Sequence, residues 1–458
     1  MSATVGDGRP ISTTRVLIAG GGIAALELLL ALRALAGSYV TVTLLTAEPT
    51  LAPRAMSVAE PFERGAAQTW EWSQIVRDEH AELVLDRLVA VDAAQRMVFT
   101  DGGRRLEYDV LVVATGARRV EPFGGALTFG LADDAAADVQ AMVADVLVRG
   151  GADIAFALPS PSAWPLALYE LALLTAAELR EQGSDATVRI VTPEQHPLEL
   201  FGLAARDALA PMFEALGISV VLSTQPREVS ARGVLLGDGV RLAADRVVTI
   251  ADVVARPVPG LPIDRAGFIP VDLHGRVIGE SGVYAAGEAT AFPLRQGGLA
   301  AQQADAVAGA IAAACGAGNV PVAFTPVLRG RLLTSGAPLY LQARASGQSL
   351  ASPHALWSPP EKIAGRYLAP YLATARPSRL AAEPLFERVP AAADSGGDAL
   401  DAVTLALALA GAEARCANRL RALAAFEAAL ALQPGAGGPP ARARGAAARD
   451  GCAAVIVG

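Results

Sequence analysis

The sequence has little cysteine, and what it has comes late in the chain. Cys315, Cys416 and Cys452 are the three cysteines among 458 residues, and no two of them have CxxC spacing. This count excludes a framework of disulfide bonds and favours a reducing compartment. We therefore expect a cytoplasmic protein.

Long apolar runs and concentrated positive charge are also missing. The sequence contains no proline-free run of about eighteen uncharged apolar residues, so we expect no membrane-spanning helix. The N-terminus lacks the basic-then-apolar order of a secretory signal. Peripheral membrane contact stays open. The net charge of −8, with no dense basic run, argues against a nucleic-acid partner. Nothing in the sequence indicates an oligomeric state.

Histidines are equally sparse. His80, His196, His274 and His354 are isolated along the sequence, and none has the spacing of metal ligands. We therefore expect no metal site.

Apolar residues, by contrast, are abundant. Hydrophobic residues make up 52% of the chain and charged residues 18%, which allows large cores in about three domains. The pattern predicts a strand over 15–20, a helix over 23–36 and a strand over 40–47, and this order is a βαβ unit. A second unit of the same kind is predicted over about 152–192.

A glycine motif joins the first predicted strand to the first predicted helix. In "RVLIAGGGIAALE", Gly20 permits a tight turn, Gly22 permits close approach of a pyrophosphate, and Ala25 permits close packing of helix on strand. The helix N-terminus adds N–H donors for an anion. At the end of the second strand, either Thr46 or Glu48 is placed to accept a ribose hydroxyl.

Two further stretches decide the kind of nucleotide. "YDVLVVATGAR" (108–118) is a predicted strand that ends at Ala114, Thr115 and Gly116, and the stretch 275–311 contains a strand that ends at Gly287 and Glu288 before an alanine-rich helix. Together with the first motif, they resemble the FAD-dependent pyridine nucleotide-disulfide oxidoreductases. The branch that contains sulfide:quinone oxidoreductases and type II NADH dehydrogenases is the most similar.

The resemblance implies an α/β fold with two Rossmann-like FAD/NAD(P)-binding domains, a small α+β C-terminal domain and a helical tail. The expected FAD-binding domain is discontinuous, and it is followed by the other parts in chain order. The expected ranges are 14–125 with 251–320 for the FAD domain, 126–250 for the second domain, 321–395 for the C-terminal domain, 396–434 for a helical hairpin and 435–458 for a flexible tail.

The resemblance also implies roles for individual residues toward FAD. Gly20, Gly22 and Ala25 would hold the pyrophosphate, Thr46 or Glu48 the adenosine ribose, and Leu88 the adenine. Arg54 would contact a phosphate or the flavin, and Ala114, Thr115 and Gly116 would line the path of the chain beside the cofactor. Gly287 and Glu288 would meet the ribitol, where the family usually has an aspartate. Gly298 and Leu299 would open a helix aimed at the flavin ring.

The turn of the second βαβ unit lacks glycine altogether. Pro159–Trp164 replaces the second GxGxxG motif that NAD(P)H-binding members of this family carry. Proline removes N–H donors, and side chains prevent close approach, so the pyrophosphate cradle is lost. The absence of cysteines before Cys315 equally excludes the sulfur-carrying cysteines of sulfide oxidation and a disulfide reductase.

These observations predict an enzyme that passes electrons through bound FAD, from a non-nicotinamide donor to a quinone-like or other small acceptor. Two alternatives remain open. One is an NAD(P)H-dependent FAD oxidoreductase that resembles type II NADH dehydrogenases. The other is a non-catalytic, redox-responsive flavoprotein that binds a partner through the 396–434 hairpin. No catalytic residue is assigned.

Overall fold

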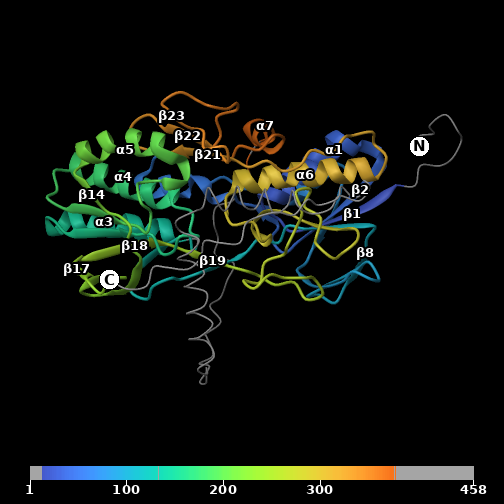
Figure 1. Cartoon of the computed structure of the whole chain (residues 1–458), viewed down its shortest axis with the longest axis horizontal. Helices are drawn as coiled ribbons and strands as arrows, with labels where there is room; N and C mark the ends of the chain where they lie inside the picture. The colour runs from blue at the N-terminus through green and yellow to red at the C-terminus, as the bar shows by residue number, and fades with distance from the viewer. Residues whose placement is uncertain (1–12, 133, 376, 378–458) are drawn as a thin grey trace, which may run out of the picture.

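The computed structural model describes residues 13–132, 134–375 and 377. The chain forms two parallel-sheet domains side by side, with a small antiparallel sheet above their junction (Figure 1). The N-terminal domain contains the beginning of the chain and α6 (Gly297–Ala314), whereas α3 (Ala135–Arg149), α4 (Leu166–Glu181) and α5 (Gly202–Leu216) belong to the second domain. This arrangement confirms the expected α/β fold class.

The first domain is built on a five-stranded parallel sheet. Its strand order is β20-β9-β1-β2-β5. Helix α1 (Ile23–Ala36) has the bounds that the sequence pattern predicts, and it packs against α6 on one face of the sheet. The strands are β1 (Thr14–Ala19), β2 (Val40–Thr46), β5 (Glu82–Leu85), β9 (Val110–Val113) and β20 (Val283–Ala285).

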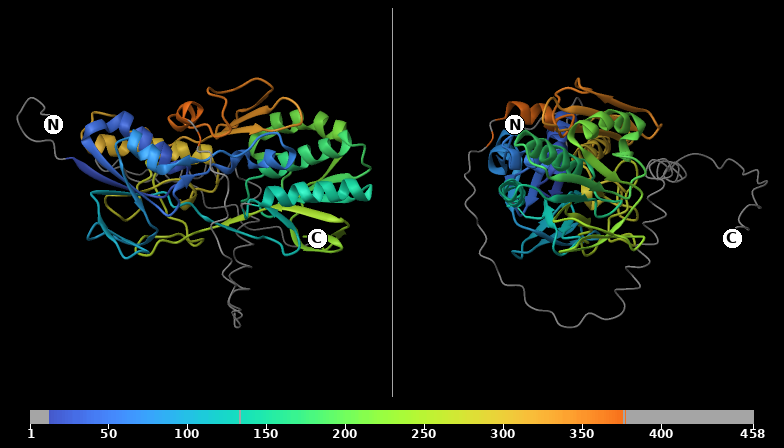
Figure 2. Two further views of the ribbon diagram at one scale, coloured as in Figure 1. Left: turned by 180° about the vertical axis from the view of Figure 1, so that it is seen from behind. Right: turned by 90° about the vertical axis from the view of Figure 1, so that its left-hand side faces the viewer.

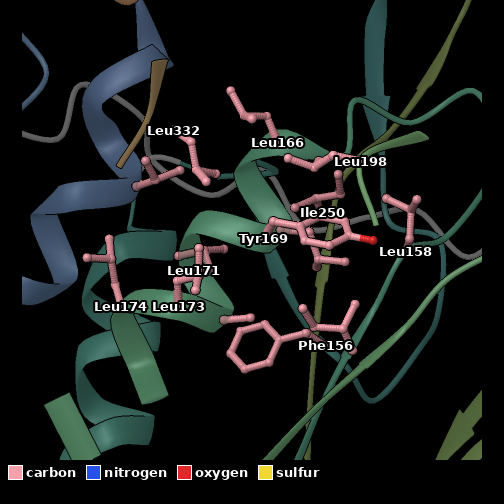
Figure 3. Close-up of a cluster of buried hydrophobic side chains, with 14 of the residues drawn as sticks. Phe156, Leu158, Leu166, Tyr169, Leu171, Leu173, Leu174, Leu198, Ile250 and Leu332 are labelled. Atoms are coloured by element: carbon pink, nitrogen blue, oxygen red, sulfur yellow. The ribbon is translucent and has the colours of Figure 1, made fainter. Parts of the chain in front are cut away.

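The second domain repeats this plan. Its sheet has the order β11-β18-β12-β13-β14, again with the first strand of the βαβ unit in the centre. The strands are β11 (Leu127–Phe129), β12 (Asp153–Ala157), β13 (Thr187–Val191), β14 (Ile218–Val221) and β18 (Arg246–Ile250). Buried apolar side chains fill the space between this sheet and α4, with Phe156 and Tyr169 among them (Figure 3).

Smaller elements complete the two domains. Each domain carries a three-stranded antiparallel sheet, and a short antiparallel pair links the two chain crossings between the domains. The remaining elements are β3 (Thr50–Leu51), β4 (Trp70–Glu71), α2 (Trp72–Asp78), β6 (Leu88–Asp92), β7 (Met97–Thr100), β8 (Arg105–Glu107), β10 (Arg118–Val120), β15 (Pro226–Ser230), β16 (Gly233–Leu236), β17 (Arg241–Leu242) and β19 (Asp252–Val254).

The C-terminal part contains an antiparallel sheet and one short helix. Strands β21 (Val327–Leu332), β22 (Leu339–Arg344) and β23 (Ser349–Ser352) lie over the junction of the domains, and α7 (Leu368–Thr374) packs on α1 (Figure 2). A Cβ on Gly330 of β21 would lie 2.7 Å from Cζ of Phe201, so this strand sits tightly on the second domain. The expected hairpin 396–434 and tail 435–458 lie outside the described residues.

A buried carboxylate fixes the start of α7. Glu27 of α1 accepts hydrogen bonds from the backbone N–H of Tyr367 (2.9 Å) and of Leu368 (2.6 Å). Its neighbour on α6, Asp305, forms a hydrogen bond with it. Burial, and then the charge of Glu27, raise the pKa of Asp305 to about 8, while Arg366 opposes the shift. Asp305 is therefore the protonated partner at neutral pH, and the pair joins α1, α6 and α7.

We expect Asp305→Asn to reduce the loss of stability at alkaline pH. Folding raises the pKa of Asp305 above the value in the unfolded chain. The contribution of Asp305 to the free energy of unfolding is therefore complete below about pH 4 and is lost as the pH rises through about 8. Asparagine keeps a hydrogen-bond donor at every pH, so the variant should exceed the wild type by about 2 kcal/mol near pH 9. Urea unfolding of both proteins near pH 5 and pH 9 measures this. Parallel pH dependences in the two proteins would contradict the assignment.

Candidate functional site

The carboxyl ends of the first domain's parallel strands meet at one edge of the sheet, and this edge positions the site. Gly20 follows β1, Ala114 follows β9 and Gly287 follows β20. A Cβ on Gly20 would lie 2.1 Å from the carbonyl oxygen of Ala114. The structure therefore brings together the ends of three strands that the sequence analysis singled out.

A cavity of about 410 Å³ opens at this edge, between the two domains and beneath the C-terminal sheet. All three parts of the chain contribute to its wall. Of the predicted site residues, Gly22, Arg54, Ala114, Gly116, Gly287 and Glu288 line it.

The amino-terminal end of α1 faces this cavity. Gly22 is the N-cap residue, and a Cβ at this position would have no protein atom within 4 Å. The helix therefore presents its first N–H groups to open space, as a pyrophosphate requires. Ala25 is fully buried behind Gly22, and Gly20 holds the turn against Ala114.

The two alternatives for the ribose differ in the structure. Thr46 is buried, and its hydroxyl both donates to the carbonyl oxygen and accepts from the N–H of Glu48 (3.2 Å each). A Cβ on Gly21 would lie 2.2 Å from the Thr46 Oγ1, so this threonine braces the glycine turn. Glu48 is exposed. Neither residue lines the cavity, and the ribose contact stays a prediction.

The second helix end at the cavity belongs to α6. Gln296 caps this helix, because its Oε1 accepts from the Leu299 N–H (2.8 Å) while its Nε2 donates to the Arg329 carbonyl (3.2 Å). Gly297 begins the helix and lines the cavity with Gln296, whereas Gly298 and Leu299 are buried outside the lining. The helix begins at Gly297, one residue before the predicted Gly298, and Gly297 and the two residues before it form the wall.

The other predicted residues lie farther from the lining. Thr115 lies between two lining residues, and its buried hydroxyl has no partner within the described chain. Leu88 lies on β6, in the small antiparallel sheet of the first domain, and does not line the cavity. Its contact with adenine stays a prediction.

The sequence analysis assigned no site residue to the part of the cavity wall that the second domain and the C-terminal segment supply. Trp164 and Leu166 line the cavity, and Trp164 packs edge-on against Phe201 at 5.7 Å between ring centroids. Glu170 and Lys362 also line it as a buried ion pair, with 2.8 Å between Oε2 and Nζ. In the sequence, Glu170 lies within the apolar run LALYELALL, whereas Lys362 follows Glu361 in the stretch SPPEKIAG.

Burial shifts both members of this pair toward their neutral forms. It raises the pKa of Glu170, against the opposing charge of Lys362, and it lowers the pKa of Lys362, against the opposing charge of Glu170. The Glu170 Oε1 also accepts from the backbone N–H of Leu333 (2.8 Å). The pair is thus held at the cavity wall by contacts between α4 and the C-terminal segment.

The donor set of the cavity fits FAD. It combines an open glycine cradle at Gly22, two helix N-termini, and a carboxylate at Glu288 that accepts no hydrogen bond from the described residues. These groups suit a pyrophosphate, a polyol and an electron-rich ring system.

Among the described residues, no group of three or more histidine, cysteine, aspartate or glutamate side chains could hold a metal ion. No described helix is long and apolar enough to cross a membrane.

Comparison with known proteins agrees with this geometry. The chain is 31% identical over 225 residues to an NADH dehydrogenase-like protein of Mycobacterium tuberculosis. The aligned region covers 45% of this chain and 55% of that protein. The chain thus spans about half the length of that relative. It is 29% identical over 357 residues to the ferredoxin reductase component of a chlorobenzene dioxygenase from a Cupriavidus strain (70% of this chain, 80% of that protein).

The fold is also found among solved structures. The sulfide:quinone oxidoreductase of Aquifex aeolicus superimposes with a TM-score of 0.67 at 17% identity, over 74% of this chain and 87% of that chain. Residues 14–314 match the family described as pyridine nucleotide-disulphide oxidoreductase. The chain therefore belongs to the pyridine nucleotide-disulphide oxidoreductase family, whose members are FAD-dependent oxidoreductases.

Proposed function

We propose that this protein is an FAD-dependent oxidoreductase that takes electrons from a non-nicotinamide donor and passes them to a quinone-like or other small acceptor. The observation that carries the proposal is the filled turn of the second βαβ unit. The first unit has an open glycine cradle at the corresponding place.

Side chains and backbone close the second turn. Pro159 and Ala163 are buried, and the Ala163 N–H is bonded to the Ser160 hydroxyl (3.2 Å). Gln225 reaches across from the strand edge, and its Nε2 donates to the Pro159 carbonyl (2.6 Å). The turn therefore lacks the glycines that let a backbone approach a pyrophosphate, and one of its N–H groups is already engaged.

The acidic residue of the second domain that corresponds to Glu48 is also engaged. Thr192-x-Glu194 follows β13 as Thr46-x-Glu48 ends β2, so the two domains share this feature. Glu194 is buried, and its carboxylate accepts from the Tyr169 hydroxyl (2.8 Å) and the Glu199 N–H (3.1 Å). Burial raises the pKa of Tyr169 well above its ordinary value, so the tyrosine stays a donor. Glu194 thus stabilises the core instead of facing a ligand.

The flavin supplies two-electron chemistry when it is bound. The chain's contribution is to hold it and to move a proton. Glu170 and Lys362 lie at the cavity wall with pKa values shifted toward each other, and a two-electron reduction of a quinone-like acceptor consumes protons. The pair is therefore a suitable proton donor, and its burial keeps bulk water from the same wall.

We expect NADH to leave the flavin oxidised. Under anaerobic conditions the absorbance of the purified holoprotein should not change when NADH or NADPH is added, because the second turn offers no pyrophosphate cradle. Dithionite should bleach the same sample, and a soluble quinone should restore the colour. Prompt bleaching by NADH would overturn the proposed donor class.

An NAD(P)H-dependent activity is the second candidate. The names of the mycobacterial and dioxygenase-system relatives favour it, since both refer to nicotinamide or ferredoxin reductase chemistry. The same absorbance experiment separates the two candidates. Rapid turnover with any donor and acceptor would exclude the third, a flavoprotein that only binds a partner.

A further inference from the structure

Arg295 lies at the cavity wall, two residues before α6. The protein contacts one edge and one face of its guanidinium group. Its Nη1 donates to the carbonyl oxygens of Thr290 (3.2 Å) and Phe292 (2.6 Å). Its guanidinium lies over the ring of Phe268, with 3.6 Å between Cζ and the ring centroid. These contacts fix the plane of the guanidinium and leave its other edge to the cavity.

The free edge of Arg295 carries donors without partners. Neither Nη2 nor Nε bonds to any residue in the described part of the chain, although Arg295 lines the cavity beside Gln296 and Gly297. Glu288 lines the same cavity and attracts Arg295 without a direct hydrogen bond between them. A donor and an acceptor thus face one space, and neither satisfies the other.

The charge on Arg295 is permanent. Burial lowers the pKa of Arg295, and the negative charges of Glu288 and Asp264 oppose this shift. An arginine nevertheless keeps its proton throughout the physiological range. The cavity therefore contains a partly desolvated positive charge next to the N-terminus of α6, which adds a positive dipole end of its own.

We propose that Arg295 contacts the ring of the bound flavin and favours the negatively charged reduced form of the flavin. This inference rests on the FAD assignment of the proposed function but not on the identity of the donor. The pyrophosphate cradle at Gly22 belongs to α1, whereas Arg295 adjoins the other helix end. The ring is therefore the part of the cofactor that this arginine serves.

Sulfite binding provides the test, because sulfite adds to oxidised flavin and leaves a negative charge on the ring. We expect Arg295→Gln holoprotein to bind sulfite about tenfold more weakly than wild type, with a more negative flavin midpoint potential. Arg295→Lys should recover part of both. Arg232→Gln is the matched control, because it removes an exposed arginine that does not line the cavity and should leave both values unchanged.

A second variant keeps the test decisive if Arg295→Gln folds poorly. In Arg295→His the charge can be switched by pH, so sulfite affinity relative to wild type should rise as the pH falls through about 6.5. A ratio that does not change with pH would overturn the proposal. So would an Arg295→Gln protein that binds FAD more weakly but has the wild-type potential, since that result would assign Arg295 to the phosphates. Reduction by NADH would contradict the proposed donor and leave these outcomes unaffected.

Discussion

Gly20→Ala should yield a protein that neither retains FAD nor reaches wild-type stability. The φ of Gly20 is +141°, and an added Cβ would lie 2.1 Å from the carbonyl oxygen and 2.4 Å from the carbonyl carbon of Ala114. Both atoms are backbone atoms of the neighbouring strand end, so no side-chain rotation relieves the clash. Backbone strain and overpacking together should lower the free energy of unfolding by about 2–5 kcal/mol.

Gly22→Ala is the matched control for this substitution. Its φ of −106° is open to any residue, and no protein atom lies within 4 Å of the added Cβ. The apoprotein should therefore unfold at the wild-type urea concentration, while the methyl group projects into the cavity and weakens FAD binding by about tenfold or more. Urea unfolding and FAD titration of both apoproteins measure the difference. A Gly20→Ala protein with normal stability and cofactor content would refute this account of the turn.

Lys362→Met should produce the second large effect, because it leaves Glu170 without its charged partner. The Glu170 side chain is 1% exposed and the Lys362 side chain 8% exposed. Removing one member of such a pair costs about 3–5 kcal/mol, most of it the burial of an uncompensated charge. The double variant Glu170→Gln with Lys362→Met should recover much of this stability, since it leaves no charge at the site.

The pH dependence of this loss distinguishes a buried charge from lost packing. Without Lys362, the pKa of Glu170 in the folded protein rises further above its unfolded value. The stability that protonation gives is then complete at low pH and is lost as the pH rises. Urea unfolding should thus show a smaller penalty near pH 5 than near pH 8. An equal penalty at both values would point to packing of the lysine stem.

The local motifs made much of the fold predictable. Gly20, Gly22 and Ala25 lie between a strand and a helix whose bounds follow from apolar periodicity, and helix 23–36 is confirmed residue for residue. Parallel strands must end at one edge, so the meeting of Ala114 and Gly287 with Gly20 followed from the order of motifs.

The remaining wall depends on contacts between segments far apart in sequence. Glu170 and Lys362 are separated by 192 residues, and no local pattern pairs them. Arg295 faces the cavity because two carbonyl groups and the ring of Phe268 orient it, and these are tertiary contacts. The contact of Thr46 with the glycine turn is likewise a tertiary contact that no local pattern shows.

The order in which the wall is assembled has a consequence for biosynthesis. Both parallel sheets are complete by Ala285, but Lys362 and Ile363 of the wall come later in the chain, just before the segment that Glu27 anchors to α1. During translation the two domains can thus form with the cavity still open on this side. Docking of residues 362–374 against α1 then completes the wall on this side.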